Sequence, residues 1–227
     1  ITSPVDSDKE RVLFMELNEE IEHLNSLILQ MSGVVEKNLF YAFDVYLNYD
    51  NNKYYHAVDD EKVNAYERWI EADALHIMLK EKLYASDLRI VTGITSMVQD
   101  LERLGDHAKD ILEFSLKVKN ANKNQKEIKE LVEFVIQMVK DSVKSYMDKN
   151  ESLAREVVLR DDHVDETYSR LIDELIHQDQ GKEISSDYAI YTALVVKYIE
   201  RIADHATNVA EWVIYILTGF YKDKQVI

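Results

Sequence analysis

Two acidic segments carry the residues of this sequence that are best suited to chemistry. Glu102 and Asp106 are four positions apart, and Glu200 and Asp204 have the same spacing. On an α-helix, side chains four residues apart lie on one face, about 5–6 Å apart at Cβ, so the two can share a ligand. Stacked carboxylates also repel one another, and a bound cation would remove that repulsion. The spacing therefore predicts a cation site in each segment.

The two segments belong to an internal repeat. Residues 102–114 and 200–212 are identical at six of thirteen positions. Upstream, residues 60–64 correspond in the same order to residues 161–165. If the helices that carry these stretches pack together, each copy offers four oxygen-bearing side chains. The candidate metal ligands are, in the first copy and then in the second, Asp60, Asn64, Glu102 and Asp106, and Asp161, Asp165, Glu200 and Asp204.

An isolated acidic pair of this kind is usually only a solvated helix face in so acidic a protein. Repetition favours a ligand site here, because a solvated face has no reason to keep its identity in a diverged repeat. On the helical wheel, Glu102 and Asp106 point away from the apolar stripe, toward solvent or a shallow groove. Carboxylates favour Mg, Mn, Ca, Fe or Zn. For His107 and His205, hydrogen bonding to a neighbour and metal ligation both stay open.

Apolar residues recur with the 3.6-residue period of an α-helix along most of the chain. Five glycines and one proline leave few places for turns, which argues against a many-stranded fold. The predicted fold is all-α, with two tandem, pseudo-symmetric antiparallel three-helix bundles, residues 1–121 and 122–227. The six predicted helices span approximately residues 7–47, 53–80, 86–119, 127–149, 152–178 and 186–219.

Individual residues indicate how these helices end and pack. Gly219 follows the last apolar turn and is predicted to stop the sixth helix. Gly105, where the second copy has Ala203, predicts a close approach between two helices. Trp69 and Trp212 are predicted in the core or at its edge.

Composition excludes several functions. The net charge of −16 disfavours a nucleic-acid surface and direct adhesion to anionic lipid. With no cysteine, thiolate metal sites and a cysteine nucleophile are impossible. We find no apolar stretch long enough to span a membrane, no signal-peptide pattern, and no nucleophile elbow, His-Glu-x-x-His or Walker motif. The sequence gives no support for an enzyme.

Residues 100–108 and 198–211, with Ala85-Ser-Asp-Leu-Arg89 and the closing residues 212–219, resemble the PhoU family of phosphate-uptake regulators. The resemblance covers about residues 16–219. It implies two tandem three-helix bundles and a cytoplasmic protein, peripheral to the membrane through its partners. It also implies a negative regulator of the phosphate-starvation response that links the ATPase of the phosphate ABC transporter to a sensor histidine kinase, with a homodimer as a further expectation.

The resemblance also implies multinuclear iron or another metal, such as Zn, Mn or Mg, bound through Glu/Asp-x-x-x-Asp motifs at the eight candidate ligands. The sequence departs from the family pattern at Asn64, where a carboxylate is expected, at residues 81–84, where a Gln-Pro is usual, and at Asp110, where Asn is common. The first departure predicts a weaker site in the first copy.

Two other functions are open alternatives. One is an accessory or cytosolic domain of another phosphate or cation transporter. The other is a ferritin-like metal protein, but its Glu-x-x-His pairs should lie on facing helices of one bundle. The two that occur, at residues 20–23 and 174–177, are in different halves at non-equivalent positions.

Overall fold

A computed structural model describes residues 4–52, 54–80, 83–118, 125–222 and 224–225 of the chain. These residues are almost entirely helical, which confirms the all-α prediction. None of the helices among them is long and apolar enough to cross a membrane. The helices are α1 (Pro4–Leu47), α2 (Asp60–Met78), α3 (Ala85–Val118), α4 (Gln125–Met147), α5 (Glu151–Leu159), α6 (Asp161–Gln180) and α7 (Ser186–Thr218), and a small hairpin of β1 (Phe220–Tyr221) and β2 (Lys224–Gln225) follows.

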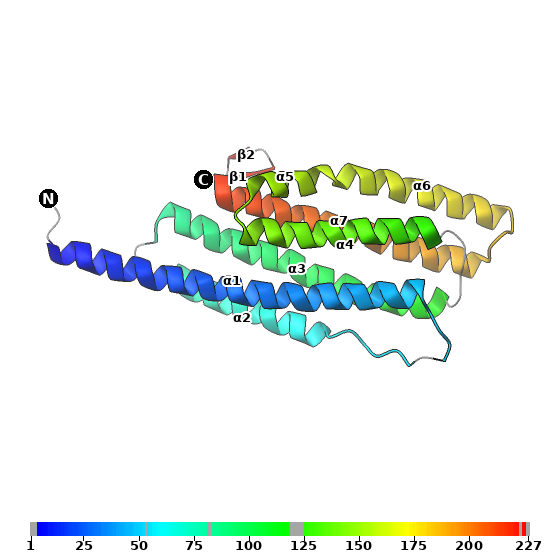
Figure 1. The fold of residues 1–227 in the computed structure, drawn as a ribbon, viewed down its shortest axis with the longest axis horizontal. Coiled ribbons are helices and arrows are strands. Elements are labelled where there is room, and N and C mark those ends of the chain that lie inside the picture. The colour runs from blue at the N-terminus through cyan, green and yellow to red at the C-terminus, as the bar shows by residue number, and fades with distance from the viewer. Residues whose placement is uncertain (1–3, 53, 81–82, 119–124, 223, 226–227) are drawn as a thin grey trace.

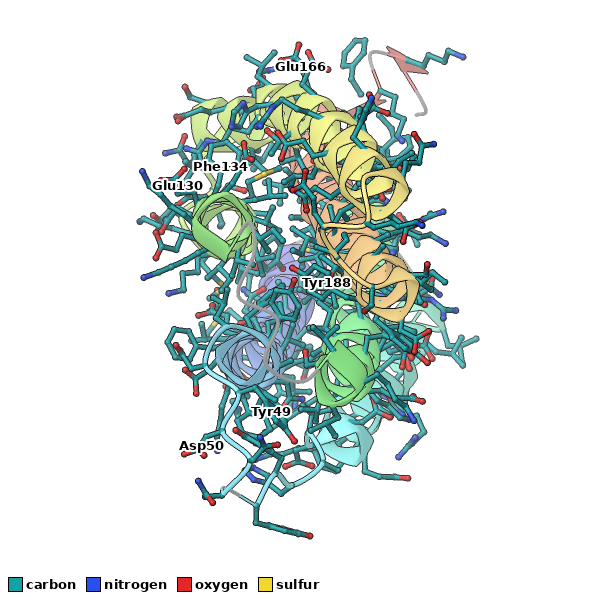
Figure 2. The ribbon with its side chains drawn as sticks, turned by 90° about the vertical axis from the view of Figure 1, so that its right-hand side faces the viewer. Tyr49, Asp50, Glu130, Phe134, Glu166 and Tyr188 are labelled. Atoms are coloured by element: carbon teal, nitrogen blue, oxygen red, sulfur yellow. The ribbon has the colours of Figure 1, made fainter. Side chains whose placement is uncertain are left out.

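The helices form two groups that lie side by side along one long axis (Figure 1). The view along the helices shows α1–α3 in the lower group and α4–α7 in the upper group (Figure 2). α3 and α7 make the most extensive contact between elements, and one continuous apolar core includes residues of all seven helices. The two predicted bundles are therefore halves of a shared core. Their predicted boundary at residues 121/122 lies outside the described residues.

The internal repeat is plainest in the burial of α1 and α4. Ten buried positions of α1 are matched by buried positions of α4 one hundred residues later. In α1 they are 28, 31, 32, 35, 38, 39, 42, 43, 45 and 46, and in α4 they are 128, 131, 132, 135, 138, 139, 142, 143, 145 and 146. Side-chain identity is kept at only a few of these pairs, for example Val35 and Val135. Duplication has therefore preserved which positions face the core more strictly than which residues fill them.

The second helix begins later than predicted, at Asp60 rather than near residue 53, and the described residues before it are not helical. The buried side chain of Asn38 makes two hydrogen bonds with the backbone of Asp59. Its Oδ1 accepts from Asp59 N and its Nδ2 donates to Asp59 O, each at 3.2 Å. Tyr41 Oη likewise accepts from His56 N at 3.0 Å. These side chains satisfy backbone groups that a helix would otherwise pair. The second copy has Met138 at the position of Asn38.

The fifth predicted helix is divided in two, because Arg160 separates α5 from α6. Asn150 caps α5 by accepting from Leu153 N at 3.0 Å. The Arg160 guanidinium reaches back to Asp141 Oδ2 on α4 at 2.6 Å, so the break is tied to a neighbouring helix. The predicted stop of the last helix is confirmed, since Gly219 ends α7 in the left-handed conformation with φ of 83°.

Glycines let α3 approach two other helices closely. A Cβ on Gly105 would lie 3.0 Å from Val63 Cγ1 of α2, which confirms the predicted close approach. A Cβ on Gly93 would overlap Cγ1 of Ile216 on α7. The α2–α3 and α3–α7 contacts therefore both depend on missing side chains.

Replacing Gly93 by Ala should lower the free energy of unfolding by about 1–3 kcal/mol, because the added methyl overpacks the α3–α7 contact. Gly33→Ala is the matched control. It is also helical, but a Cβ there has no neighbour within 4 Å, so helix propensity alone should stabilise the protein by up to about 1 kcal/mol. Urea unfolding measures both. Equal stability of the two variants would contradict this account of the contact.

Candidate metal centres

The first candidate centre lies between α2 and α3. Asp60 and Asn64 stand one turn apart near the start of α2, and Glu102 and Asp106 do so in the middle of α3. The structure brings the two helices together here, because the carboxylates of Asp60 and Asp106 both act on Glu102. Lys109 of α3 closes the cluster with its Nζ 3.4 Å from Asp60 Oδ2.

The second candidate centre occupies the equivalent place between α6 and α7. Asp161 and Asp165 come from the first turns of α6, and Glu200 and Asp204 come from α7. All four carboxylates are close enough to repel one another. The eight predicted ligands therefore form two groups of four, one in each half. Asp165 is exposed and the other seven are half-buried. Glu102 and Asp106 thus lie off the core, as the helical wheel predicted, at a partly buried place between two helices.

Burial and mutual repulsion raise the pKa of several of these carboxyl groups. Burial is the larger cause for both Glu102 and Glu200, and neighbouring carboxylates add to it. The effect is strongest at Asp161, where burial, then Asp204 and then Asp165, raises the pKa from the ordinary 3.8 to about 6. Each cluster thus holds negative charge at a cost that a cation would relieve.

The residues present fit a cation in one further respect. Asp60 Oδ1, Asn64 Oδ1 and Asp161 Oδ1 are buried and have no hydrogen-bond partner within the described part of the chain. A buried oxygen without a donor is costly, and a cation would satisfy it. No three His, Asp or Glu side chains among the described residues already surround one point as a formed metal cage. Binding would therefore require the carboxylates to turn inward.

Three nearby residues were not predicted from the sequence. Glu67, one turn beyond Asn64 on the same face of α2, adds a fourth carboxylate to the first cluster and acts on Glu102. Lys109 lies in that cluster, and its counterpart Thr207 lies beside Asp161. Alignment of the repeat pairs Lys109 with Thr207, so this difference was present in the sequence. Helical spacing also signals Glu67, which is three positions from Asn64.

The histidines lie in the contact between α3 and α7. His205 Nδ1 is 2.8 Å from Asp100 Oδ1 and donates to it, because a carboxylate only accepts. Asn208 Nδ2 donates to the same oxygen at 3.2 Å, and Trp212 Nε1 donates to Asp100 Oδ2 at 3.1 Å. Asp100 thus joins α3 to three residues of α7. His205 has the hydrogen-bonding role that the sequence left open, and Trp212 lies at the edge of the core.

The equivalent position on the other helix carries Tyr198 in place of Asp100. Its ring lies 5.2 Å from that of His107 and stacks on Phe114 at 5.6 Å between centroids. His107 also faces His205, with ring centroids 5.2 Å apart. Burial first, and His205 second, lower the pKa of His107 to about 4, so its imidazole is neutral at physiological pH. The two histidines meet at the pseudo-symmetric centre of the contact.

A separate cavity of about 570 Å³ lies between α1 and α2, away from both clusters. It is lined by His23 and His76 among acidic residues, with His23 Nε2 3.4 Å from Asp73 Oδ2. Lys80 Nζ already pairs with Glu20 Oε1 there at 2.6 Å. This cavity holds one of the two Glu-x-x-His pairs, and the other pair, Glu174 and His177, lines a cavity of about 660 Å³ on α6, so both cavities are rival locations for a metal.

The fold and the paired clusters define the class of protein: a duplicated helical bundle with one acidic cluster in each repeat. The sequence profile of the PhoU domain matches the chain twice, at residues 28–115 and 128–213. These matches cover most of the chain and fall on its two halves. The chain belongs to the PhoU family.

Related proteins agree with this assignment. The phosphate-specific transport system accessory protein PhoU homolog of Clostridium acetobutylicum is 33% identical over 209 residues, which cover 90% of this chain and 95% of that protein. The crystal structure of PhoU from Pseudomonas aeruginosa matches with a TM-score of 0.83 at 27% identity, over 89% of this chain and 99% of that one. The phosphate transport system regulatory protein PhoU from Streptococcus pneumoniae, 22% identical, shares the fold with a TM-score of 0.78 over 93% of this chain and 99% of that one.

The strained carboxylate of Asp161 predicts a pH-dependent stability in metal-free protein. Because its folded-state pKa is raised to about 6, the fold prefers the protonated form. Stability is therefore lost as pH rises from about 4 to about 6, and the whole cost is present above that range. Asp161→Asn should raise the free energy of unfolding at pH 7.5 by about 1 kcal/mol, after allowance for solvent screening, and by nothing below pH 4.

Asp162→Asn is the matched control, because Asp162 is exposed and both residues lie in the first turn of α6. Both variants lose the same favourable interaction with the helix N-terminus, so the difference between their free energies of unfolding gives the contribution of the acidic cluster. Urea unfolding across this pH range in a chelator measures it. A stability gain that persists at pH 3.5 would contradict the assigned cause.

Proposed function

We propose that the protein is a non-enzymatic, metal-binding regulator of phosphate uptake and phosphate-starvation signalling. The observation that carries the metal-binding part is the buried, unpaired oxygen of Asp161 within a group of four mutually repelling carboxylates. Membership of the PhoU family supports the regulatory part, since relatives are named as phosphate-specific transport system accessory proteins. Those names describe accessory proteins and so support a role without catalysis.

Carboxylate and amide oxygens suit hard or borderline cations. Iron in a multinuclear centre is the metal proposed first, with Zn, Mn or Mg as alternatives. When bound, the metal would supply the positive charge that joins α2 to α3 or α6 to α7. The proposed ligands are Asp60, Asn64, Glu102 and Asp106 in the first half, and Asp161, Asp165, Glu200 and Asp204 in the second.

In this proposal the protein acts as an adaptor on the cytoplasmic side of the membrane. It binds the ATPase of the phosphate ABC transporter and a sensor histidine kinase, and it restrains the starvation response when phosphate is plentiful. It reaches the membrane through these partners and binds no nucleic acid, in agreement with its net charge of −16. A homodimer is part of the proposal for its assembly.

A docking role is supported by the outer face of α2. Trp69, Leu75 and Leu79 point away from the core, with 55%, 58% and 75% of their surface exposed, so the prediction that Trp69 is in the core or at its edge was wrong. Ala72 completes a stripe with helical spacing, which defines the α2 face. Apolar patches of this kind mark sites of protein interaction. The corresponding residues on α6 are Arg170, Asp173, Ile176 and Gln180.

The alternative is an accessory or cytosolic domain of a different phosphate or cation transporter. It shares the metal clusters and the α2 face with the leading proposal and differs in the partner. Binding to the ATPase of the phosphate ABC transporter separates the two.

Loss of Glu200 and Asp204 should abolish most metal binding in the second half. We expect Glu200→Gln/Asp204→Asn to lower the metal content of purified protein by at least half, because two of the four carboxylate ligands become uncharged amides. The double variant Asp162→Asn/Glu166→Gln removes an exposed acidic pair with the same spacing on α6 and should change nothing. Elemental analysis gives the result. Equal metal content in the two double variants would contradict the ligand assignment.

Removing the apolar groups of the α2 face should weaken binding to the transporter ATPase about tenfold or more, because exposed Trp and Leu anchors carry much of the energy of such contacts. Trp69→Ser/Leu75→Ser is the test, and Arg170→Ser/Ile176→Ser at the equivalent positions of α6 is the control. Biolayer interferometry with the purified ATPase subunit measures both. No binding by the unchanged protein would favour the alternative transporter, and equal binding by the two variants would rule out the α2 face.

A further inference from the structure

The two acidic clusters occupy equivalent places in the repeat but differ in their charges. Residue 64 is Asn where its counterpart, residue 165, is Asp, and residue 109 is Lys where its counterpart, residue 207, is Thr. Glu67 compensates for the first difference, since its own counterpart is Tyr168. Four carboxylates therefore surround each proposed site. Lys109 adds a cation that is paired directly with one of them, and Asp110, whose counterpart is Asn208, adds a further carboxylate beside Lys109.

Lys109 places a positive charge at the exposed edge of the first cluster. Its Nζ lies 3.4 Å from Asp60 Oδ2, so it bridges α3 and α2 at one of the proposed ligands. Asp106 and Asp110 also act on this ammonium group. The hydrogen bond with Asp60, followed by the charge of Asp60, raises the pKa of Lys109, which keeps it protonated. Its side chain is 63% exposed, so the pair is screened, but its charge opposes any second cation.

Among the described residues, no lysine forms an ion pair with a carboxylate of the second cluster, where Arg201 Nε lies 3.9 Å from Glu200 Oε2. Thr207 is neutral, and the buried Oδ1 of Asp161 has no hydrogen-bond partner among the described residues. Arg201 corresponds to Arg103 of the first half, so these two charges do not distinguish the clusters. Lys222 acts on Asp204 from a distance, but its Nζ is paired with Glu211 Oε2 at 3.1 Å.

We propose that Lys109 serves as a resident cation of the first cluster, so that only the second cluster takes up a divalent metal ion. The first half is then held together by an ion pair and the second by a metal. This inference rests on the proposed metal binding and adds which half carries it and why. A bound metal in the second half would link α6 to α7 as Lys109 links α3 to α2.

Reciprocal exchanges between the halves test the inference. Asn64→Asp/Lys109→Thr gives the first cluster the second cluster's residues at these two positions, and Asp165→Asn/Thr207→Lys does the reverse. Apo protein is titrated with Mn²⁺ by calorimetry, and bound metal is counted by elemental analysis after desalting. We expect the first exchange to double the metal content of the unchanged protein, and the second to weaken binding at least tenfold.

Lys109→Arg is the matched control, because it keeps the charge and should leave the metal content unchanged. Circular dichroism melting of each apo variant confirms that it folds, and Lys109→Thr alone provides a second, milder opening of the first cluster. Metal in both halves of the unchanged protein, or an unchanged content after Asn64→Asp/Lys109→Thr, would overturn the inference while metal binding stands. No metal in any form, the opened variants included, would overturn the proposed metal binding and the inference with it.

Discussion

The packing of α3 against α7 is the contact on which the rest of the structure depends. α3 also packs on α1 and α2, and α7 also packs on α4, α5 and α6, so each half is assembled around one of these two helices. Gly93 lets their surfaces approach, and Asp100 ties them by hydrogen bonds to His205 and Trp212. Both acidic motifs lie on these two helices, and their carboxylates face α2 and α6. The helices that complete the two clusters, α2 and α6, lie on opposite sides of this central pair (Figure 1).

Much of this arrangement could be predicted from the sequence, because the spacing of apolar residues along a helix indicates which face is buried. The helices, the duplication and the columns of acids at residues 102–106 and 200–204 all follow from spacing along one helix. The missed features depend on partners across helices. Asn38 delays the start of α2 by bonding to Asp59, and Arg160 at the break after α5 is tied to Asp141 of α4. Spacing within one helix cannot reveal either partner.

The candidate centres show the same limit. The upstream repeat predicted that Asp161 and Asp165 would join Glu200 and Asp204, and the structure places them together. The sequence could not predict that Asp161 would be buried deeply enough to raise its pKa, because burial depends on how α6 lies on α7. The difference at residue 109 was visible in the alignment of the repeat. The structure adds that Lys109 pairs with Asp60 on another helix, which the alignment cannot show.

Duplication has thus kept a backbone and a burial pattern while the side chains diverged. The proposed function depends most on a metal bound between α6 and α7. Anomalous diffraction from crystals grown with Mn²⁺ tests it most directly. We predict a peak among the carboxylates of Asp161, Asp165, Glu200 and Asp204. A peak in the α1–α2 cavity beside His23 and His76, with none between α6 and α7, would contradict it.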